Sequence, residues 1–64
     1  MNKYRLWTGP TLVNQAAEWL EQAGLTVTVR GTESVYVLAN NQDQVLNALP
    51  KGSGWTWRDV TKLN

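Results

Sequence analysis

Hydrophobic and polar residues alternate one by one near the start of the chain, which is the pattern of a half-buried β-strand. In residues 3–8, Tyr4 and Leu6 fall on one face, and Arg5 and Trp7 fall on the other. We therefore expect a strand whose apolar face contacts the core and whose other face carries a cation and an aromatic ring.

Two further alternating runs predict a β-hairpin over residues 25–30 and 35–38. Both runs are rich in β-branched residues, and residues 31–34 between them are suited to a turn. The expected core face of the hairpin comprises Leu25, Val27, Val29, Val35 and Val37, and the opposite face comprises Thr26, Thr28, Arg30, Tyr36 and Leu38.

Apolar residues recur at helical spacing between the first strand and the hairpin. Gly9 and Pro10 suit the start of a helix, and Gly24 suits a left-handed cap at its end, so we expect a helix from about Pro10 to Ala23. Its buried stripe is expected to comprise Val13, Ala16, Ala17, Leu20 and Ala23, with Trp19 at the edge of the stripe.

A second, shorter helix is expected to begin at Asn40 or Asn41 and to end before Pro50. Gln44 stands three residues after Asn41, which is the spacing of a weak capping box. Val45, Leu46 and Leu49 are expected to form its buried side.

The last predicted strand runs over residues 55–61, after a flexible loop at residues 51–54. Alternation places Trp55 and Trp57 on one side, and we expect both to lie in the core, because the chain has no phenylalanine. A register shifted by one residue would instead direct both indoles outward and Val60 inward.

The element order is therefore β-α-β-β-α-β, within a single domain covering residues 1–64. With right-handed crossovers, this order predicts a ferredoxin-like α+β domain: a four-stranded antiparallel sheet with both helices on one face. The alternative is a three-stranded sheet with one helix, in which residues 40–50 form a loop.

The predicted outer face of this sheet is the most distinctive feature of the chain. All three arginines fall on it, together with a tryptophan and a tyrosine on the two central strands, and no acid shares it. Four of the five acids fall on helices or a turn, and Asp59 falls near a strand end. The candidate partner-binding residues are Arg5, Trp7, Arg30, Tyr36, Leu38 and Arg58.

Several interpretations of that face are open. Tryptophan, tyrosine and arginine are the residues that most often anchor protein interfaces, so docking on a partner protein, or self-association, is the favoured one. A small chain of this kind fits a regulator or inhibitor that covers the surface of its partner. Aromatic residues on central strands also stack unpaired bases in RNA-recognition domains, which makes single-stranded nucleic acid the alternative. The rings could also simply cover the bare sheet without a partner.

Composition narrows the remaining classes of function. The chain has 64 residues, a net charge of +1 and neither cysteine nor histidine. It therefore has no thiol nucleophile, no imidazole base and no thiolate or imidazole metal ligand, and nothing in the sequence points to a carboxylate-based reaction. We expect no enzymatic activity, no metal and no cofactor. No apolar run approaches the ~20 residues of a membrane span. No signal peptide is visible, and the absence of cysteine fits a reducing compartment, so we expect a cytoplasmic protein.

Overall fold

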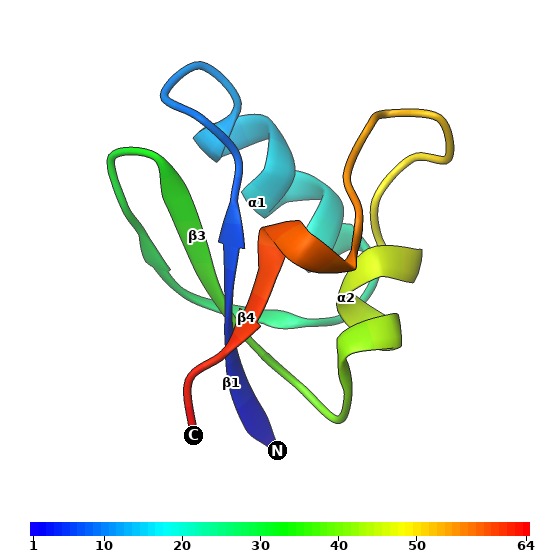
Figure 1. Ribbon diagram of the computed structural model, residues 1–64. Helices are drawn as coiled ribbons and strands as arrows, with labels where there is room; N and C mark the ends of the chain where they lie inside the picture. Colours follow the sequence, from blue (N-terminus) through cyan, green and yellow to red (C-terminus); the bar gives the residue numbers. More distant parts are fainter.

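The computed structural model describes all 64 residues and contains four strands and two α-helices (Figure 1). A short 3₁₀ helix, η1, directly precedes the last strand. The elements are β1 (Asn2–Trp7), α1 (Val13–Gln22), β2 (Thr26–Arg30), β3 (Ser34–Ala39), α2 (Gln42–Asn47), η1 (Trp57–Asp59) and β4 (Val60–Lys62).

The strands form one sheet in the order β2-β3-β1-β4, and every neighbouring pair is antiparallel. The expectation of a small α+β domain with a four-stranded antiparallel sheet and two helices is therefore confirmed. The alternative with three strands and one helix is wrong, because α2 forms within residues 40–50 and β4 adds a fourth strand beside β1.

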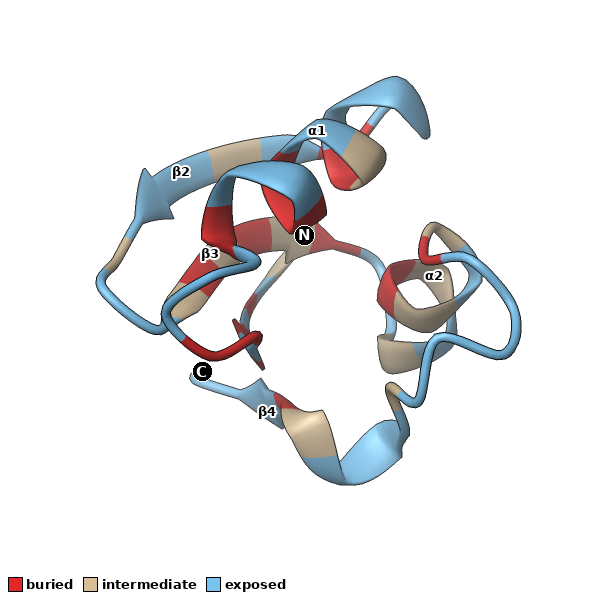
Figure 2. Ribbon diagram, turned by 90° about the horizontal axis from the view of Figure 1, so that it is seen from above, coloured by how far each residue is buried: buried red, intermediate tan, exposed pale blue.

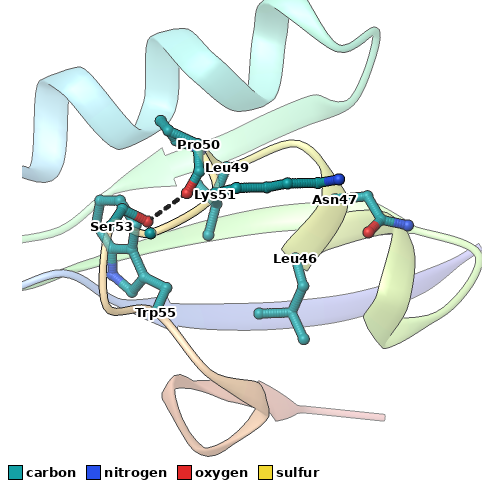
Figure 3. A pocket seen from close by; sticks show the side chains of 8 residues that line it. Leu46, Asn47, Leu49, Pro50, Lys51, Ser53 and Trp55 are labelled. Atoms are coloured by element: carbon teal, nitrogen blue, oxygen red, sulfur yellow. Dashed lines mark hydrogen bonds between the residues drawn. The ribbon is translucent and has the colours of Figure 1, made fainter.

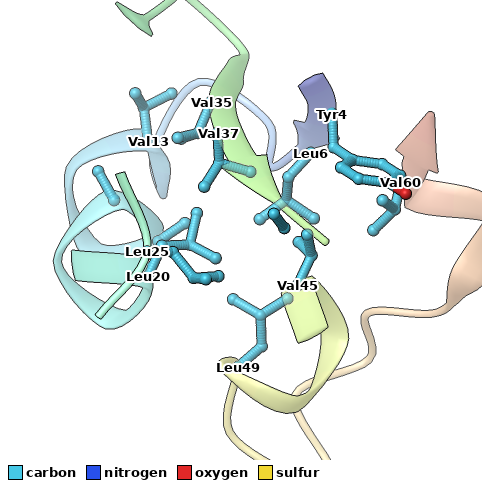
Figure 4. Close-up of a cluster of buried hydrophobic side chains, with 13 residues drawn as sticks. Tyr4, Leu6, Val13, Leu20, Leu25, Val35, Val37, Val45, Leu49 and Val60 are labelled. Carbon is cyan, nitrogen blue, oxygen red and sulfur yellow. The ribbon is translucent and has the colours of Figure 1, made fainter. Parts of the chain in front are cut away.

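One hydrophobic cluster of 13 residues joins both helices to the same face of the sheet (Figure 4). Leu6 of β1, Val37 of β3 and Leu20 of α1 are among its fully buried members. The other members are Tyr4, Val13, Ala16, Ala17, Leu25, Val35, Ala39, Val45, Leu49 and Val60. Because the strands contribute alternate residues, the opposite face of the sheet is left outside this core.

The end of α1 follows the prediction, whereas its start does not. Gly24 has φ +88°, and the amide of Leu25 donates to the carbonyl of Leu20 over 3.1 Å, which is the pattern of a Schellman cap. The helix starts at Val13 rather than near Pro10. The amide of Gly9 still donates to the carbonyl of Glu33 in the hairpin turn over 3.0 Å. The chain therefore leaves the sheet only after Gly9, and the helix begins later than predicted.

The start of α2 is capped by side chains, as its spacing predicts. The Asn41 side chain accepts a hydrogen bond from the Gln44 amide over 2.8 Å. The Gln44 side chain in turn accepts from the amide of Asn40 over 2.7 Å, one residue earlier than a capping box requires. These bonds fix the point at which the chain turns from β3 into α2.

The prediction of a long final strand over residues 55–61 is wrong, because β4 comprises only Val60–Lys62. The preceding residues form a tight turn. The Asp59 carboxylate accepts from the Thr56 backbone amide over 2.9 Å, and the Thr56 hydroxyl accepts from the Arg58 backbone amide over 3.3 Å. This reciprocal cap favours η1 over continued strand.

Candidate functional site: the open face of the sheet

Strand register places one set of side chains on the sheet face opposite the core, and we call this set the open face. Three come from β1, three from β3, two from β2 and one from β4. They are Lys3, Arg5, Trp7, Ser34, Tyr36, Leu38, Thr26, Val29 and Thr61.

The centre of the open face follows the prediction made from alternation. Arg5 lies directly opposite Tyr36 across the β1–β3 pair, and Trp7 lies opposite Ser34. Leu38, also predicted here, lies opposite Lys3. Arg5 is exposed and Tyr36 half-buried. Four of the six predicted site residues, Arg5, Trp7, Tyr36 and Leu38, therefore share one surface.

Trp7 is the largest exposed group of the open face, with 52% of the residue accessible. Its ring lies beside Gly9, where an added Cβ would be 3.7 Å from the ring atom Cη2. Gly9 has φ +78°, a conformation that glycine adopts without strain, and this lets the chain turn away directly after the tryptophan. The indole is thus supported along one edge while much of its surface stays open to a partner.

Arg30 is not on the open face, so its predicted placement is wrong. The β2–β3 ladder contains an irregularity between Val27 and Val29, after which Arg30 pairs with Val35 of the core face. An extra residue in a ladder moves every later side chain to the other side. The Arg30 guanidinium then reaches α1, where Nη2 lies 2.9 Å from Glu21 Oε1.

Val29 moves in the opposite sense, from the predicted core to the open face. It lies opposite Tyr36 and is 52% exposed. The Thr28 hydroxyl donates to the Tyr36 carbonyl over 3.3 Å at the irregularity. Figure 2 shows that β2 is exposed along most of its length. The alternation of residues 25–30 carries no signal for this shift, and analysis of the sequence missed Val29 for that reason.

Arg58, the sixth predicted site residue, is also not placed as predicted. It lies in η1 and not on a strand, because the cap between Thr56 and Asp59 turns the chain there. Its guanidinium carbon lies 5.6 Å from the ring centroid of Trp57, a distance typical of a cation–π contact. Trp57 itself is 63% exposed, so its predicted place in the core is wrong.

Trp55 is half-buried and packs against the edge of the core, so its predicted burial is partly met. Its ring centroid lies 5.5 Å from that of Trp19, with the ring planes at 80°, which is an edge-to-face contact. Its indole Nε1–H donates to the carbonyl of Trp7 over 3.2 Å. Trp55 therefore ties the end of β1 to α1 and leaves the Trp7 side chain free.

The cations of the open face, Lys3 and Arg5, have no carboxylate beside them. Glu18 and Glu21 belong to α1 and Asp43 to α2, whereas Glu33 lies in the hairpin turn. The fifth acid, Asp59, is engaged in the η1 cap described above. The structure contains a single ion pair, between Arg30 and Glu21, so the positive charge of the open face is uncompensated.

A shallow hollow of about 230 Å³ lies between α2 and the loop at residues 51–54 (Figure 3). Leu46, Leu49 and Trp55 form its apolar wall. The Ser53 hydroxyl, which also lines it, donates to the carbonyl of Pro50 over 2.6 Å. Asn47 and Lys51 also line the hollow, but it is small for a ligand pocket, and its hydroxyl is used within the loop.

Comparison of the chain with protein-family models, with curated proteins and with solved structures gave no match. Neither α-helix has the length and apolar composition needed to cross a bilayer. No three acidic side chains are grouped closely enough to hold a metal ion. The open face is therefore the feature on which a function can be argued.

Proposed function

We propose that this chain is a small non-catalytic interaction module that docks on a partner protein through its open face. The observation that carries the proposal is the placement of Trp7, a half-exposed indole on a central strand with Arg5 and Tyr36 beside it. These three residue types are the ones most enriched at energetic centres of protein interfaces.

The energy available from this anchor is appreciable. A tryptophan side chain can bury roughly 150–250 Å², so covering the exposed half of Trp7 removes about 100 Å² from water. At roughly 25 cal/mol per Å², that area corresponds to about 2.5 kcal/mol of gross stabilisation. Tyr36 and Leu38 extend the same surface, and Val29 adds an exposed branched side chain on its far side.

Single-stranded nucleic acid is the second candidate, because Trp7 and Tyr36 stand on the two central strands in positions suited to base stacking. The small number of cations on the open face favours a protein partner over a nucleic acid. Of the six lysines and arginines, Arg30 is bound to Glu21 on the helix side and Arg58 contacts Trp57. Lys51 lies in the loop after α2, and Lys62 pairs with Tyr4 of the core face, so only Lys3 and Arg5 lie on the open face. A nucleic-acid site needs a continuous positive track along the backbone.

We also propose that the architecture is a ferredoxin-like one. The central position of β1 and β3, the antiparallel pairing throughout and a core shared by both helices support this assignment. The shortness of β4 and the presence of η1 before it are departures from a regular β-α-β-β-α-β unit. Within this proposal, the helical side maintains the fold, and the bare side of the sheet is the docking surface. The chain would then act as a cytoplasmic regulator or inhibitor.

The experiment that tests this function is capture of partners from a lysate of the native host, with and without nuclease, on three immobilised forms. These are the unmodified chain, Trp7→Ala and Trp57→Ala. The last variant is a matched control, since it removes a more exposed indole from η1 and leaves the open face intact. We expect a nuclease-resistant protein that Trp57→Ala retains and Trp7→Ala loses.

Circular dichroism of each variant separates loss of docking from loss of fold. Capture of the same protein by a folded Trp7→Ala variant would show that the open face is not the docking surface. Loss of the captured material on nuclease treatment would favour the second candidate. Sedimentation equilibrium of the pure chain tests self-association, which would appear as a rising mass that Trp7→Ala removes.

A further inference from the structure

We propose that the segment recognised by the open face is an extended, acidic and apolar stretch of a partner protein. It carries two carboxylates and one large apolar side chain, in an alternating pattern that matches Lys3, Arg5 and Trp7. This inference rests on the proposed function and adds to it the chemistry of the ligand.

The first argument is the geometry of β1. Lys3, Arg5 and Trp7 are alternate residues of one strand, and all six residues of β1 pair with β3 without interruption. Successive side chains on one face of a strand are therefore spaced by about 6.7 Å. The backbone positions that carry two cations and an aromatic ring thus follow one another along a central strand at a regular spacing.

The second argument is charge. The open face contains two cations and no acid, and the one ion pair of the molecule lies on the helix side. Neither Lys3 nor Arg5 has an acidic partner within the chain, so a carboxylate that approaches them displaces no existing ion pair. Charge complementarity of this kind steers association and excludes basic partners.

The third argument is that apolar groups flank the two cations. Leu38 lies opposite Lys3 on the β3 side, and Tyr36 lies opposite Arg5, with Val29 beyond it. On the other side, the Leu63 amide donates to the Lys3 carbonyl over 2.8 Å, and Leu63 is 42% exposed. A ligand that carries only charge would leave these apolar groups in water, whereas a peptide with mixed side chains can cover them.

An extended segment fits the row because its own side chains alternate with the same spacing. Side chains at positions i, i+2 and i+4 of such a segment would lie over Lys3, Arg5 and Trp7. The proposal requires Asp or Glu at the first two positions and an aromatic or aliphatic residue at the third. The reversed order serves a segment that runs in the opposite direction. A nucleic-acid strand has no aliphatic side chains with which to cover the apolar groups beside the row.

The experiment is a selection of short random peptides displayed on ribosomes, with the immobilised full chain as bait. A parallel selection uses a Lys3→Glu, Arg5→Glu double variant, whose exposed substitutions leave the core untouched. We expect the unmodified chain to enrich peptides with alternating acids next to a large apolar residue. The double variant is expected to lose that enrichment and to favour basic residues at the same positions.

Selected peptides are then synthesised with a fluorophore and titrated against the unmodified chain, Arg5→Glu, Trp7→Ala and the control Trp57→Ala. We expect Arg5→Glu to weaken binding by about tenfold or more, because a like charge replaces an attraction. Binding should also weaken as salt is raised, since exposed charges are screened. Trp7→Ala is expected to abolish binding, and Trp57→Ala to leave it within about twofold.

The outcomes separate this inference from the function on which it rests. If the selected peptides depend on Trp7 but contain no acids, the ligand is not acidic, and docking through the open face remains supported. Peptides that bind a folded Trp7→Ala variant equally well would overturn both. A selection that yields no Trp7-dependent peptide overturns the inference. So does tight, Trp7-dependent binding of an oligothymidylate, which would assign the face to nucleic acid.

Discussion

β1 and β2 both pair with β3, one on each side, yet only β1 presents the faces that its sequence pattern predicts. In β1 the register runs unbroken from Asn2 to Trp7, so Leu6 is buried and Arg5 exposed. In β2 the register shifts after Val27, which leaves Val29 exposed. Residue alternation is equally regular in the two sequences, so the difference lies in the pairing and not in the pattern.

The comparison shows how much one irregular position changes a surface. A strand with a regular ladder keeps its charges on one side, whereas one unpaired residue carries Arg30 from the sheet surface to α1. Such irregularities also protect an edge strand from pairing with other chains, because they distort its row of free backbone groups. β2 is the strand at this edge of the sheet, and β1 is in its interior.

The largest expected effect contrasts the two strands directly. Leu6→Ala opens a cavity at a fully buried position of β1 and is expected to cost about 2–5 kcal/mol of unfolding free energy. Val29→Ala is its counterpart in β2 and is expected to cost less than about 0.5 kcal/mol, because that side chain is exposed. Urea denaturation followed by tryptophan fluorescence measures both. Similar losses for the two variants would contradict the outward placement of Val29.

The next effect concerns the end of β1, which is held from outside the sheet. Trp55→Ala removes an edge-to-face contact with Trp19 and the hydrogen bond to the Trp7 carbonyl, with an expected cost of about 2 kcal/mol. Trp57→Ala removes an exposed ring and a contact with Arg58, with an expected cost below about 1 kcal/mol. Thermal melting compares the two. Equal stability of both variants would show that Trp55 does not anchor β1.

A smaller effect is expected where α1 leads into β2. Gly24→Ala places a side chain at φ +88°, where there is no steric neighbour within 4 Å, so the cost of about 1 kcal/mol comes from the backbone alone. Because 64 residues are accessible to chemical synthesis, D-alanine at position 24 provides the matched control. D-alanine prefers positive φ, so it should equal or exceed glycine in melting temperature. A D-alanine variant as unstable as the L-alanine one would argue against the left-handed cap.

The smallest effect tests the side of β2 on which Arg30 lies. A double-mutant cycle of Arg30→Ala and Glu21→Ala is expected to give a coupling of about 0.2–1 kcal/mol, because both side chains are about half exposed. The same cycle with Arg5 in place of Arg30 is the control and should give no coupling, since Arg5 faces away from α1. Coupling of Glu21 to Arg5 instead of Arg30 would reverse the assignment of the two faces.

Much of the fold can be predicted from local patterns alone. The helix stripe around Leu20, the left-handed cap at Gly24 and the side-chain cap at Asn41 are each specified by residues close together in the chain. The same holds for β1 and β3, where alternation and β-branched residues agree with the observed strands. These features depend on the backbone preferences of nearby residues and on the periodic position of apolar residues, and both can be recognised in short stretches of sequence.

The composition of the open face was in part predictable and in part decided by long-range contacts. Arg5, Trp7, Tyr36 and Leu38 lie where alternation placed them, because β1 and β3 pair regularly at the centre of the sheet. The positions of Val29 and Arg30 depend on how β2 meets β3, and no local signal for this irregularity stands in the sequence.

By itself, the sequence determined the two helices, the strands β1 and β3, most of the buried side of each helix and the absence of acids from the central strands. Ala23, predicted to be buried, is exposed. Only the tertiary structure decided which cations share the open face. Arg30 finds Glu21, nine residues earlier in the chain, and Trp55 finds Trp7, 48 residues earlier. The physical reason is that the pairing energy of a ladder and the packing of an indole depend on partners far away in the chain, whereas helix caps and alternation depend on neighbours.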